Sequence, residues 1–341
     1  MSTSMLDGQP HGTVRTAAPP SPLESARRLV ADDLAAVERR LAELIDSEVE
    51  AIPQVVGHLA FAAGKRFRPL VALLAAAATG FEDDARCTVA AVGELLHTAT
   101  LLHDDVVDGG AFRRGRPASR VVFGNGMAVL SGDFCLARAL QAMAALGRIE
   151  AMRTMADMVA RMAEGEVAQL AMAGSFDVDV RRYYTVIDRK TAALIAWCSQ
   201  LAGLVDPAFC EALDVYGLEL GYAFQIADDV LDFASGVAVT GKARGQDFRD
   251  GKMTLPLLLA CREDPALART VERTLAGVPP VQDEVAEEVV SAVAGSRALD
   301  RARAIAGEHA ERAVHALAAL PASAARSALE DLADYVVRRR T

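Results

Sequence analysis

The chain has 341 residues, of which 52% are hydrophobic and 5% aromatic, and its formal net charge at pH 7 is −10. This acidic balance, without a long basic block, argues against nucleic acid as a partner. The five cysteines are scattered, form no C-x-x-C pair and are odd in number. We interpret them as small buried apolar residues of a protein in a reducing compartment, and not as a zinc site or a disulfide framework.

The first residues of the chain are rich in Gly, Pro, Ser and Thr and lack the apolar core of a secretion signal. We therefore expect residues 1–21 to form a flexible leader and residues 22–341 to form one domain. The longest apolar stretch, residues 69–81, is too short to span a bilayer. The sequence thus predicts a cytoplasmic protein.

From residue 22 onward the sequence has the periodicity of amphipathic helices. The pair Ser21-Pro22 is a typical helix start, and Leu34, Leu41 and Leu44 follow at helical spacing. No run alternates apolar and polar residues long enough to indicate a sheet, and the breaks carry Gly or Pro. The sequence therefore predicts an all-helical domain with a long bundle at its centre. Helices are expected, in chain order, near 22–45, 50–63, 67–79, 84–108, 126–147, 149–173, 179–204, 207–235, 252–262, 265–275, 281–294, 296–319 and 322–339.

Two acidic motifs of the form D-D-x-x-D, at 104–108 and 228–232, end two of these predicted helices. A solvated helix end would explain one copy. Two copies with apolar flanks are costly, because like charges at i and i+4 repel each other. If the copies face each other across a bundle, they form a site for hard divalent cations such as Mg²⁺, which usually completes its shell with phosphates. The carboxylates are those of Asp104, Asp105, Asp108, Asp228, Asp229 and Asp232.

Basic residues collect in the segments beside the two acidic motifs. A solvated surface explains any one of them but explains the whole set poorly. Arg forks and Lys ammonium groups next to metal-binding acids are what a diphosphate needs. No Walker A loop is present, since Lys65 is followed by Arg66 and not by Ser or Thr. The basic residues in question are Lys65, Arg66, Arg68, Arg113, Arg114, Lys190, Lys242 and Lys252.

At this point the sequence resembles the trans-isoprenyl diphosphate synthases, or polyprenyl synthetases, from about residue 25 to the end. The resemblance is carried, in the family's order, by GKRFRP, ELLHTATLLHDDVVD, RRG, GEVAQL, KTAALI, GYAFQIADDVLD and GQDFRDGKMTLP. It implies an all-α, single-domain fold of the isoprenoid synthase type, with helices around a deep central cavity. It also implies a homodimer.

The resemblance implies a role for each matching residue. Asp104, Asp108, Asp228 and Asp232 match the Mg²⁺-binding positions, with about three ions expected from the family. The residues that match the catalytic set are Asp104, Asp105, Asp108, Asp228, Asp229, Lys190 and Arg113. The residues that match the allylic diphosphate site are Arg113, Lys190, Thr191, Gln225, Lys242 and Lys252. Those that match the isopentenyl diphosphate site are Lys65, Arg68, His97 and Arg114; His97 taken alone would more often be a core histidine.

The implied reaction is a repeated head-to-tail (1'-4) condensation of isopentenyl diphosphate with an allylic diphosphate primer. Metal ions and basic side chains stabilise the charge that builds as the allylic C–O bond breaks. The residues before the first acidic motif, Ala99 and Thr100, are not aromatic, so the cavity floor is predicted to be open. The resemblance therefore favours a long all-trans polyprenyl diphosphate in the octaprenyl to decaprenyl range, of the kind used for ubiquinone side chains.

Alternatives remain open at this stage. One is a short- or medium-chain synthase that makes farnesyl or geranylgeranyl diphosphate. A less favoured one is a non-catalytic partner subunit of a heteromeric synthase, since such subunits typically lose the ligands that this chain keeps. A class I terpene cyclase fits less well, because the second acidic motif is intact. Transient membrane contact for product release is also expected, because a long polyprenyl product is insoluble.

Overall fold

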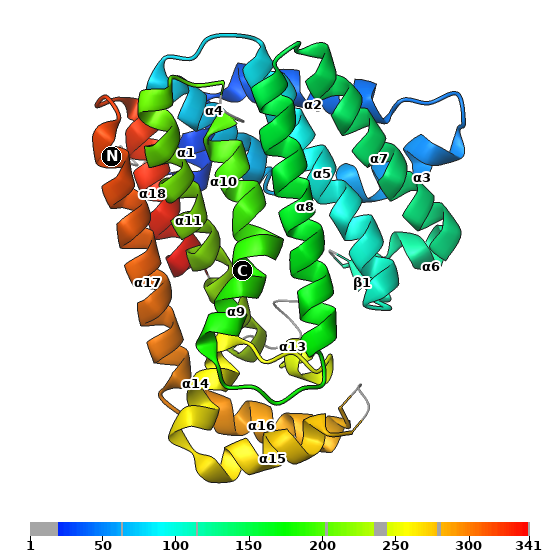
Figure 1. The fold of residues 1–341 in the computed structure, drawn as a ribbon, viewed down its shortest axis with the longest axis vertical. Coiled ribbons are helices and arrows are strands. Elements are labelled where there is room, and N and C mark those ends of the chain that lie inside the picture. Colours follow the sequence, from blue (N-terminus) through cyan, green and yellow to red (C-terminus); the bar gives the residue numbers. More distant parts are fainter. Residues whose placement is uncertain are drawn as a thin grey trace, which may run out of the picture.

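A computed structural model describes residues 20–62, 64–113, 115–201, 204–234, 244–277 and 281–339. The described part of the chain is almost entirely helical, which confirms the predicted all-α class (Figure 1). Two antiparallel strands of two residues each, β1 (Phe112–Arg113) and β2 (Arg116–Pro117), follow the first acidic motif. The sequence had indicated only a Gly-rich break there, because strands of two residues leave no alternating pattern.

The helices follow the predicted order closely. The first half of the chain contains α1 (Pro22–Leu29), α2 (Ala31–Ile45), α3 (Ala51–Ala60), α4 (Phe67–Thr79), α5 (Ala85–Val107), α6 (Ser119–Phe123), α7 (Asn125–Ala145) and α8 (Ile149–Met172). The second half contains α9 (Val180–Ile187), the π-turn η1 (Asp188–Ala192), α10 (Ala193–Ser199), α11 (Pro207–Ala234), α13 (Gln246–Arg249), α14 (Leu255–Glu263), α15 (Pro265–Leu275), α16 (Asp283–Gly295), α17 (Ala298–Ala316), the 3₁₀ turn η3 (Leu317–Ala319) and α18 (Ala324–Arg338).

The helices α4, α5, α10 and α11 form the centre of the bundle. The residues of α4 are apolar on nearly every side, and the helix is accordingly buried along most of its length. Helix α5 packs against α2, α4 and α7, and α11 packs against α10, α17 and α18. Trp197 of α10 and Tyr216 of α11 are among the largest fully buried side chains. This packing fixes the two helices that end in the acidic motifs.

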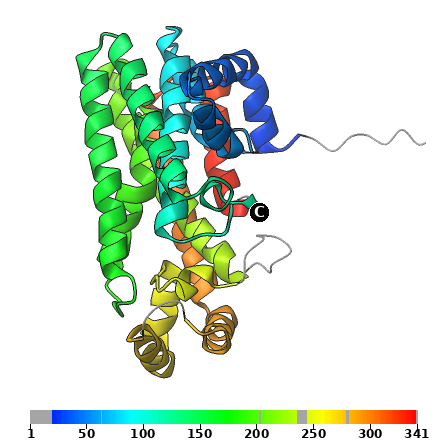
Figure 2. The same cartoon turned by 90° about the vertical axis from the view of Figure 1, so that its right-hand side faces the viewer.

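A second hydrophobic cluster lies at the lower end of the molecule in Figures 1 and 2, where α15 and α16 cross below the long helices. Helices α11 and α17 run through both clusters, with Leu220 in the first and Val230 in the second. The carboxyl end of α11 is therefore held by packing on both sides of its acidic motif.

The structure differs from the predicted elements at two helix breaks. The predicted helix 22–45 is interrupted at Val30, whose backbone angles (φ −123°, ψ 31°) are not helical. The predicted helix 179–204 contains the π-turn at Asp188–Ala192 and ends as α-helix at Ser199. The spacing of apolar residues does not reveal a single non-helical residue or one residue added to a turn, because the apolar face of the helix resumes within the next turn.

Arg66 precedes α4 with a left-handed backbone (φ 48°), which is uncommon for a residue other than Gly. Its buried guanidinium forms ion pairs with Glu38 of α2 at 2.5 Å and with Glu94 of α5 at 3.1 Å. Arg66 therefore ties the start of α4 to two neighbouring helices. This contact places the flanking basic residues Lys65 and Arg68 at the same helix end.

Among the described residues, no helix combines the length and the apolar character that crossing a membrane would require.

Candidate active site

A cavity of about 920 Å³ lies between the carboxyl ends of α5 and α11. Its described lining comes from the ends of these helices, from the 109–113 segment, from α8 and the 173–177 loop, from α9 and η1, and from residues 246–254. Three basic side chains, Arg113, Lys190 and Lys252, face eight carboxylates across this lining. The site therefore carries a large excess of negative charge. The lining aspartates are Asp104, Asp108, Asp177, Asp228, Asp229, Asp232, Asp247 and Asp250.

The first acidic motif occupies the last turn of α5, where Asp108 is the C-cap. The helix dipole places partial negative charge there, so three carboxylates are unfavourable at this position without cations. Asp105 is fully buried, and Arg113 Nε donates to its Oδ1 at 2.8 Å. Asp104 is half-buried, and burial raises the pKa of its carboxyl group to about 6, with the nearby Glu166 and Asp108 adding to this and Lys190 opposing it.

Lys190 reaches the cavity from the π-turn and forms an ion pair with Glu166 of α8. Glu166 was not among the predicted site residues. It lies within the GEVAQL segment, and its three-residue spacing from the lining residue Gln169 is not a recognisable ligand pattern. Its Oε1 is buried and has no hydrogen-bond partner among the described residues.

The second acidic motif is held by a chain of side-chain hydrogen bonds. Asp229 is 2% exposed, and it accepts from Tyr183 Oη at 2.6 Å and from Gln225 Nε2 at 2.8 Å. Thr191 Oγ1 donates to Gln225 Oε1 at 2.8 Å. Burial and the nearby carboxylate of Asp247 raise the pKa of Asp229 well above its usual range. The structure thus brings the predicted residues Thr191, Gln225 and Asp229 into one network.

Asp228 and Asp232 have different surroundings. Asp228 Oδ1 accepts from Arg339 Nη2 at 2.6 Å, and the Arg339 guanidinium lies 3.9 Å from the centroid of the Phe224 ring. Asp232 accepts from the backbone N–H groups of Gln246 at 3.1 Å and Asp247 at 3.2 Å, so it holds the start of α13. Arg339, near the end of the chain, was missed because no spacing relates it to the acidic motif.

Lys252 links the two sides of the cavity. Its Nζ lies 3.7 Å from Asp108 Oδ2, 3.7 Å from Asp250 Oδ2 and 4.0 Å from Asp247 Oδ1. Burial disfavours the charged ammonium group, but these carboxylates outweigh it and raise the pKa of Lys252. Asp247 and Asp250 were also not predicted as site residues, although GQDFRD could have been recognised as a third acidic segment.

The residues predicted for isopentenyl diphosphate lie outside this lining, as far as the structure describes them. Lys65 and Arg68, at the start of α4, are close enough to Asp228 that their charges oppose the burial that raises its pKa. Lys65 Nζ lies 5.9 Å from the centroid of the Tyr335 ring. His97 is on α5, where its carbonyl accepts from Thr100 Oγ1 at 2.9 Å. The predicted residues Arg114 and Lys242 lie outside the described residues.

The predicted chain-length positions are on α5, one turn before the first acidic motif. Ala99 is 4% exposed and belongs to the hydrophobic core, whereas Thr100 is half-buried on the same helix face as Asp104. Neither residue lines the described cavity.

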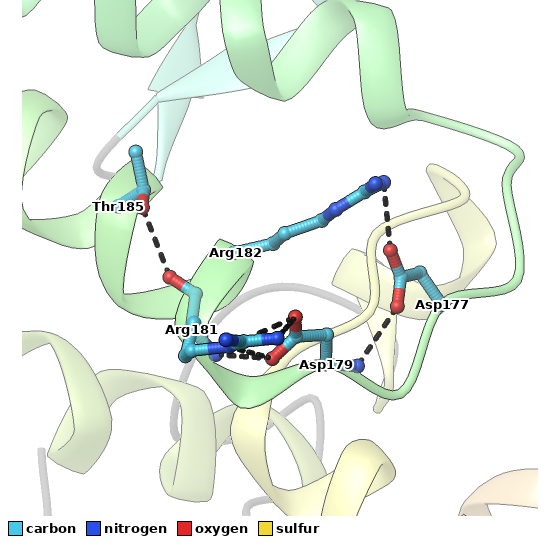
Figure 3. A network of polar contacts seen from close by, with 5 residues as sticks. All are labelled: Asp177, Asp179, Arg181, Arg182 and Thr185. Atoms are coloured by element: carbon cyan, nitrogen blue, oxygen red, sulfur yellow. Dashed lines mark hydrogen bonds and ion pairs between the residues drawn. The ribbon is translucent and has the colours of Figure 1, made fainter.

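The loop between α8 and α9 contributes Ser175 and Asp177 to the cavity lining and carries a network of polar contacts (Figure 3). Asp177 Oδ1 accepts from the Asp179 backbone N–H at 2.8 Å, and its other oxygen lies 2.7 Å from Arg182. Asp179 caps α9 and pairs with Arg181, as Figure 3 also shows. The backbone of this loop is joined to the segment that carries Lys252, since Gly174 N–H donates to Gly251 O at 3.0 Å.

The donor chemistry of the cavity fits hard divalent cations. Carboxylates are the side chains that Mg²⁺ prefers, and here they outnumber the basic groups around one cavity. Within the described ranges, no three acidic, His or Cys side chains converge into a preformed metal cluster. The arrangement therefore fits cations that share their coordination with an anionic ligand between the two motifs.

Comparisons with known proteins place this geometry in context. Residues 49–293 match the family model "Polyprenyl synthetase". The octaprenyl diphosphate synthase of Escherichia coli is 39% identical over 324 residues, which cover 93% of this chain and 99% of that protein. A crystal structure of a polyprenyl synthase from Caulobacter crescentus, complexed with calcium and isoprenyl diphosphate, has a TM-score of 0.87 at 40% identity and covers 95% of this chain and 100% of that one. A decaprenyl diphosphate synthase from Rhodobacter capsulatus has a TM-score of 0.87 at 38% identity, with 94% and 100% covered.

Replacing Asp104 by Asn should stabilise the metal-free protein at neutral pH. The carboxyl pKa is about 6 in the folded state against 3.8 for an ordinary Asp, so the folded chain binds more protons between these values and loses stability as pH rises through this window. The D104N variant should gain up to about 3 kcal/mol in unfolding free energy above pH 6 and nothing below pH 4. Urea unfolding at several pH values in EDTA measures this difference.

Asp331→Asn, which removes an exposed carboxylate on α18, is the matched control and should change stability by less than about 0.5 kcal/mol. A D104N variant that is less stable than the unaltered protein at pH 7 would contradict the unfavourable burial of this carboxylate.

Proposed function

The chain belongs to the polyprenyl synthetase family, and we propose that it condenses isopentenyl diphosphate with an allylic diphosphate primer in repeated, Mg²⁺-dependent head-to-tail (1'-4) steps. It is a trans-prenyltransferase of that family and a polyprenyl diphosphate synthase. The proposed product is a long all-trans polyprenyl diphosphate that supplies quinone side chains.

One observation carries the proposal: the ends of two acidic helices face a single cavity together with Arg113, Lys190 and Lys252. A cavity lined only by carboxylates would suit a cation alone. A cavity lined only by basic groups would suit a free phosphate. The mixture suits a diphosphate that is bridged to the carboxylates by metal ions and contacted directly by the lysines and the arginine.

The metal ions would be held by Asp104 and Asp108 on one side and by Asp228 and Asp232 on the other, with about three ions expected from the family. When bound, Mg²⁺ supplies positive charge to the diphosphate oxygens and makes the diphosphate a better leaving group. The polyprenyl synthase from Caulobacter crescentus, whose structure contains calcium and isoprenyl diphosphate, supports a site that takes a divalent cation and a prenyl diphosphate together.

The basic residues of the chain then have a defined task. Lys190 pairs with Glu166, Arg113 with Asp105, and Lys252 lies among three carboxylates, so each is held at the cavity wall by an acid. In the proposed mechanism they bind the allylic diphosphate and stabilise the negative charge that builds on it as the C–O bond breaks. Thr191 and Gln225 contribute hydrogen bonds at the same wall. Lys242 is proposed for this site from the family resemblance alone.

Isopentenyl diphosphate is proposed to bind beside Asp228, where Lys65 and Arg68 gather at the start of α4. His97 and Arg114 complete this set by resemblance. The double bond of isopentenyl diphosphate attacks the allylic carbon, the new C–C bond forms, and one proton leaves to restore a double bond. We assign that proton to the departing diphosphate, which Lys190 and Arg113 hold in place.

The long product is supported by the names of the relatives, an octaprenyl and a decaprenyl diphosphate synthase. Small residues at Ala99 and Thr100 support it as well. A short- or medium-chain product is the alternative. A role as a non-catalytic partner subunit is disfavoured, because every predicted ligand residue that the structure describes is present in this chain. Contact with a membrane during product release stays a prediction, which co-flotation of product-loaded enzyme with liposomes would test.

A homodimer is proposed from the exposed apolar residues of α7 and α8, two helices that contact each other and lie along one outer side of the molecule in Figure 2. Monomeric proteins rarely expose a large apolar patch, so a second copy is a suitable cover for it. We expect the protein to sediment at twice its chain mass of 36.0 kDa and Leu130→Glu to shift it toward the monomer. A sedimentation coefficient that is monomeric without the substitution would contradict this. The exposed residues are Val129, Leu130, Leu140, Ile149, Val167 and Leu170.

A product assay tests the proposed function. The purified protein is given isopentenyl diphosphate, farnesyl diphosphate and Mg²⁺, and the products are dephosphorylated and sized by chromatography and mass. We expect chains in the octaprenyl to decaprenyl range and no reaction in EDTA. Products that stop at geranylgeranyl length would favour the medium-chain alternative, and absence of product with every primer would favour the partner-subunit alternative.

Replacing Thr100 by Phe should shorten the product. Thr100 lies one turn before Asp104 on the same face of α5, so an aromatic ring there would project below the site where the allylic chain begins. We expect the main product to lose several isoprene units while the rate of the first condensation stays within about threefold. Thr100→Val, which keeps the side-chain volume, is the control and should leave the product length unchanged. An unaltered product from the Phe variant would place the length-limiting residues elsewhere.

A further inference from the structure

The helix that carries Lys190 and Thr191 contains a π-turn, Asp188–Ala192, between α9 and α10. A π-turn adds one residue to a helical turn and so changes the direction in which the following side chains point. Because such a turn is rare and locally unfavourable, the surrounding structure has to hold it. The direction of Lys190 and Thr191 therefore depends on whatever fixes this turn.

Two glycines allow the neighbouring helices to approach the backbone of the π-turn. A Cβ atom on Gly165 of α8 would lie 2.7 Å from Arg189 Cβ and 2.9 Å from Lys190 N. A Cβ atom on Gly221 of α11 would lie 2.5 Å from Ala192 Cα. The turn is thus enclosed between α8 and α11 at distances that no other residue type would permit.

The same two helices also hold the first residue of the turn through its side chain. Tyr222 of α11 donates from Oη to Asp188 Oδ1 at 2.7 Å, and Arg161 of α8 donates from Nη2 to Asp188 Oδ2 at 2.8 Å. We name these three residues the Asp188 clamp. Both carboxylate oxygens are used, so the clamp fixes the rotation of the turn and not only its distance from the neighbours.

The aromatic ring of Tyr222 is itself held in place. It packs edge-on against Tyr184, with ring centroids 5.8 Å apart, and against His309, at 5.1 Å. Tyr184 Oη and His309 Nε2 are 2.8 Å apart, and His309 Nδ1 lies 2.6 Å from Glu219 Oε2. Burial and the carboxylate of Asp188 raise the pKa of Tyr222, so its hydroxyl stays protonated and can donate.

On its opposite side the π-turn faces the cavity. Lys190 contacts Glu166, and Thr191 donates to Gln225. Lys190 and Thr191 line the cavity, whereas Asp188, Tyr222 and Arg161 do not. The clamp can therefore act on a bound diphosphate only through the turn itself.

We propose that Asp188, held by Tyr222 and Arg161, is a positioning residue that sets the direction of Lys190 and Thr191 toward the allylic diphosphate. The inference rests on the proposed function, because it takes these two residues as diphosphate ligands. The contact with Tyr222 is the stronger part of the clamp, since Arg161 is 45% exposed and an exposed ion pair contributes little.

The test uses the full-length protein with Tyr222→Phe and Asp188→Ala, assayed with Mg²⁺, an allylic diphosphate and isopentenyl diphosphate. Tyr222→Phe removes one hydroxyl group and keeps the ring packing. We expect the KM for the allylic diphosphate to rise about three- to tenfold, with the KM for isopentenyl diphosphate changed by less than about twofold. In the double variant, the KM for the allylic diphosphate should rise no further than in the more affected single variant, because both substitutions remove the same contact.

The matched control is Glu164→Gln, which removes an ion pair between α8 and Arg189 of the same π-turn at 3.1 Å. It should leave both KM values unchanged. Thermal unfolding of every variant separates positioning from folding: a lower Tm with an unchanged allylic KM would overturn the inference, as would equal rises in both KM values. Failure of the unaltered protein to form any product would instead overturn the proposed function and not the clamp geometry.

Discussion

The main physical constraint on this structure is electrostatic: two helix ends that carry carboxylates point into one cavity, where the carboxylates repel each other. Helices α5 and α11 both end in carboxylates, where the helix dipole already places negative charge. Their burial raises the pKa of Asp104, Asp228 and Asp229 instead of lowering it. The bundle keeps this unfavourable arrangement because α5 and α11 are fixed by the core behind them. Under the proposed function, the arrangement would become favourable once cations and a diphosphate occupy the cavity.

Basic side chains of the protein reduce this electrostatic repulsion by pairing with the carboxylates. Arg113, Lys190, Lys252 and Arg339 each contact one of the cavity's acids or a neighbouring carboxylate. The groups proposed to bind substrate are therefore already paired and held at the wall before any ligand arrives. The proposed binding would exchange one set of ion pairs for another, which would reduce the ordering of side chains that binding requires.

Close helix packing controls the direction of these basic side chains. Glycines on α8 and α11 allow both helices to touch the π-turn that carries Lys190, and the Asp188 clamp fixes its rotation from outside the cavity. The core beneath the first acidic motif has a related role, because Ala99 is part of the hydrophobic core while Thr100 remains half-buried beside it. Small residues thus allow close helix packing around the cavity, with Gly165 and Gly221 at the π-turn and Ala99 in the core behind the first acidic motif.

The sequence by itself determined the longer helices, their order and the two acidic motifs, because helical periodicity, caps and D-D-x-x-D spacing are local patterns. It did not indicate the short helices α6 and α13. It also indicated the family, which the matching family model and relatives confirmed. It did not indicate Glu166, Asp247 or Arg339, nor the π-turn at Asp188–Ala192. Those features were decided by the tertiary structure alone, since a contact such as Asp228–Arg339 joins residues 111 positions apart and arises only when the packed helices bring them together.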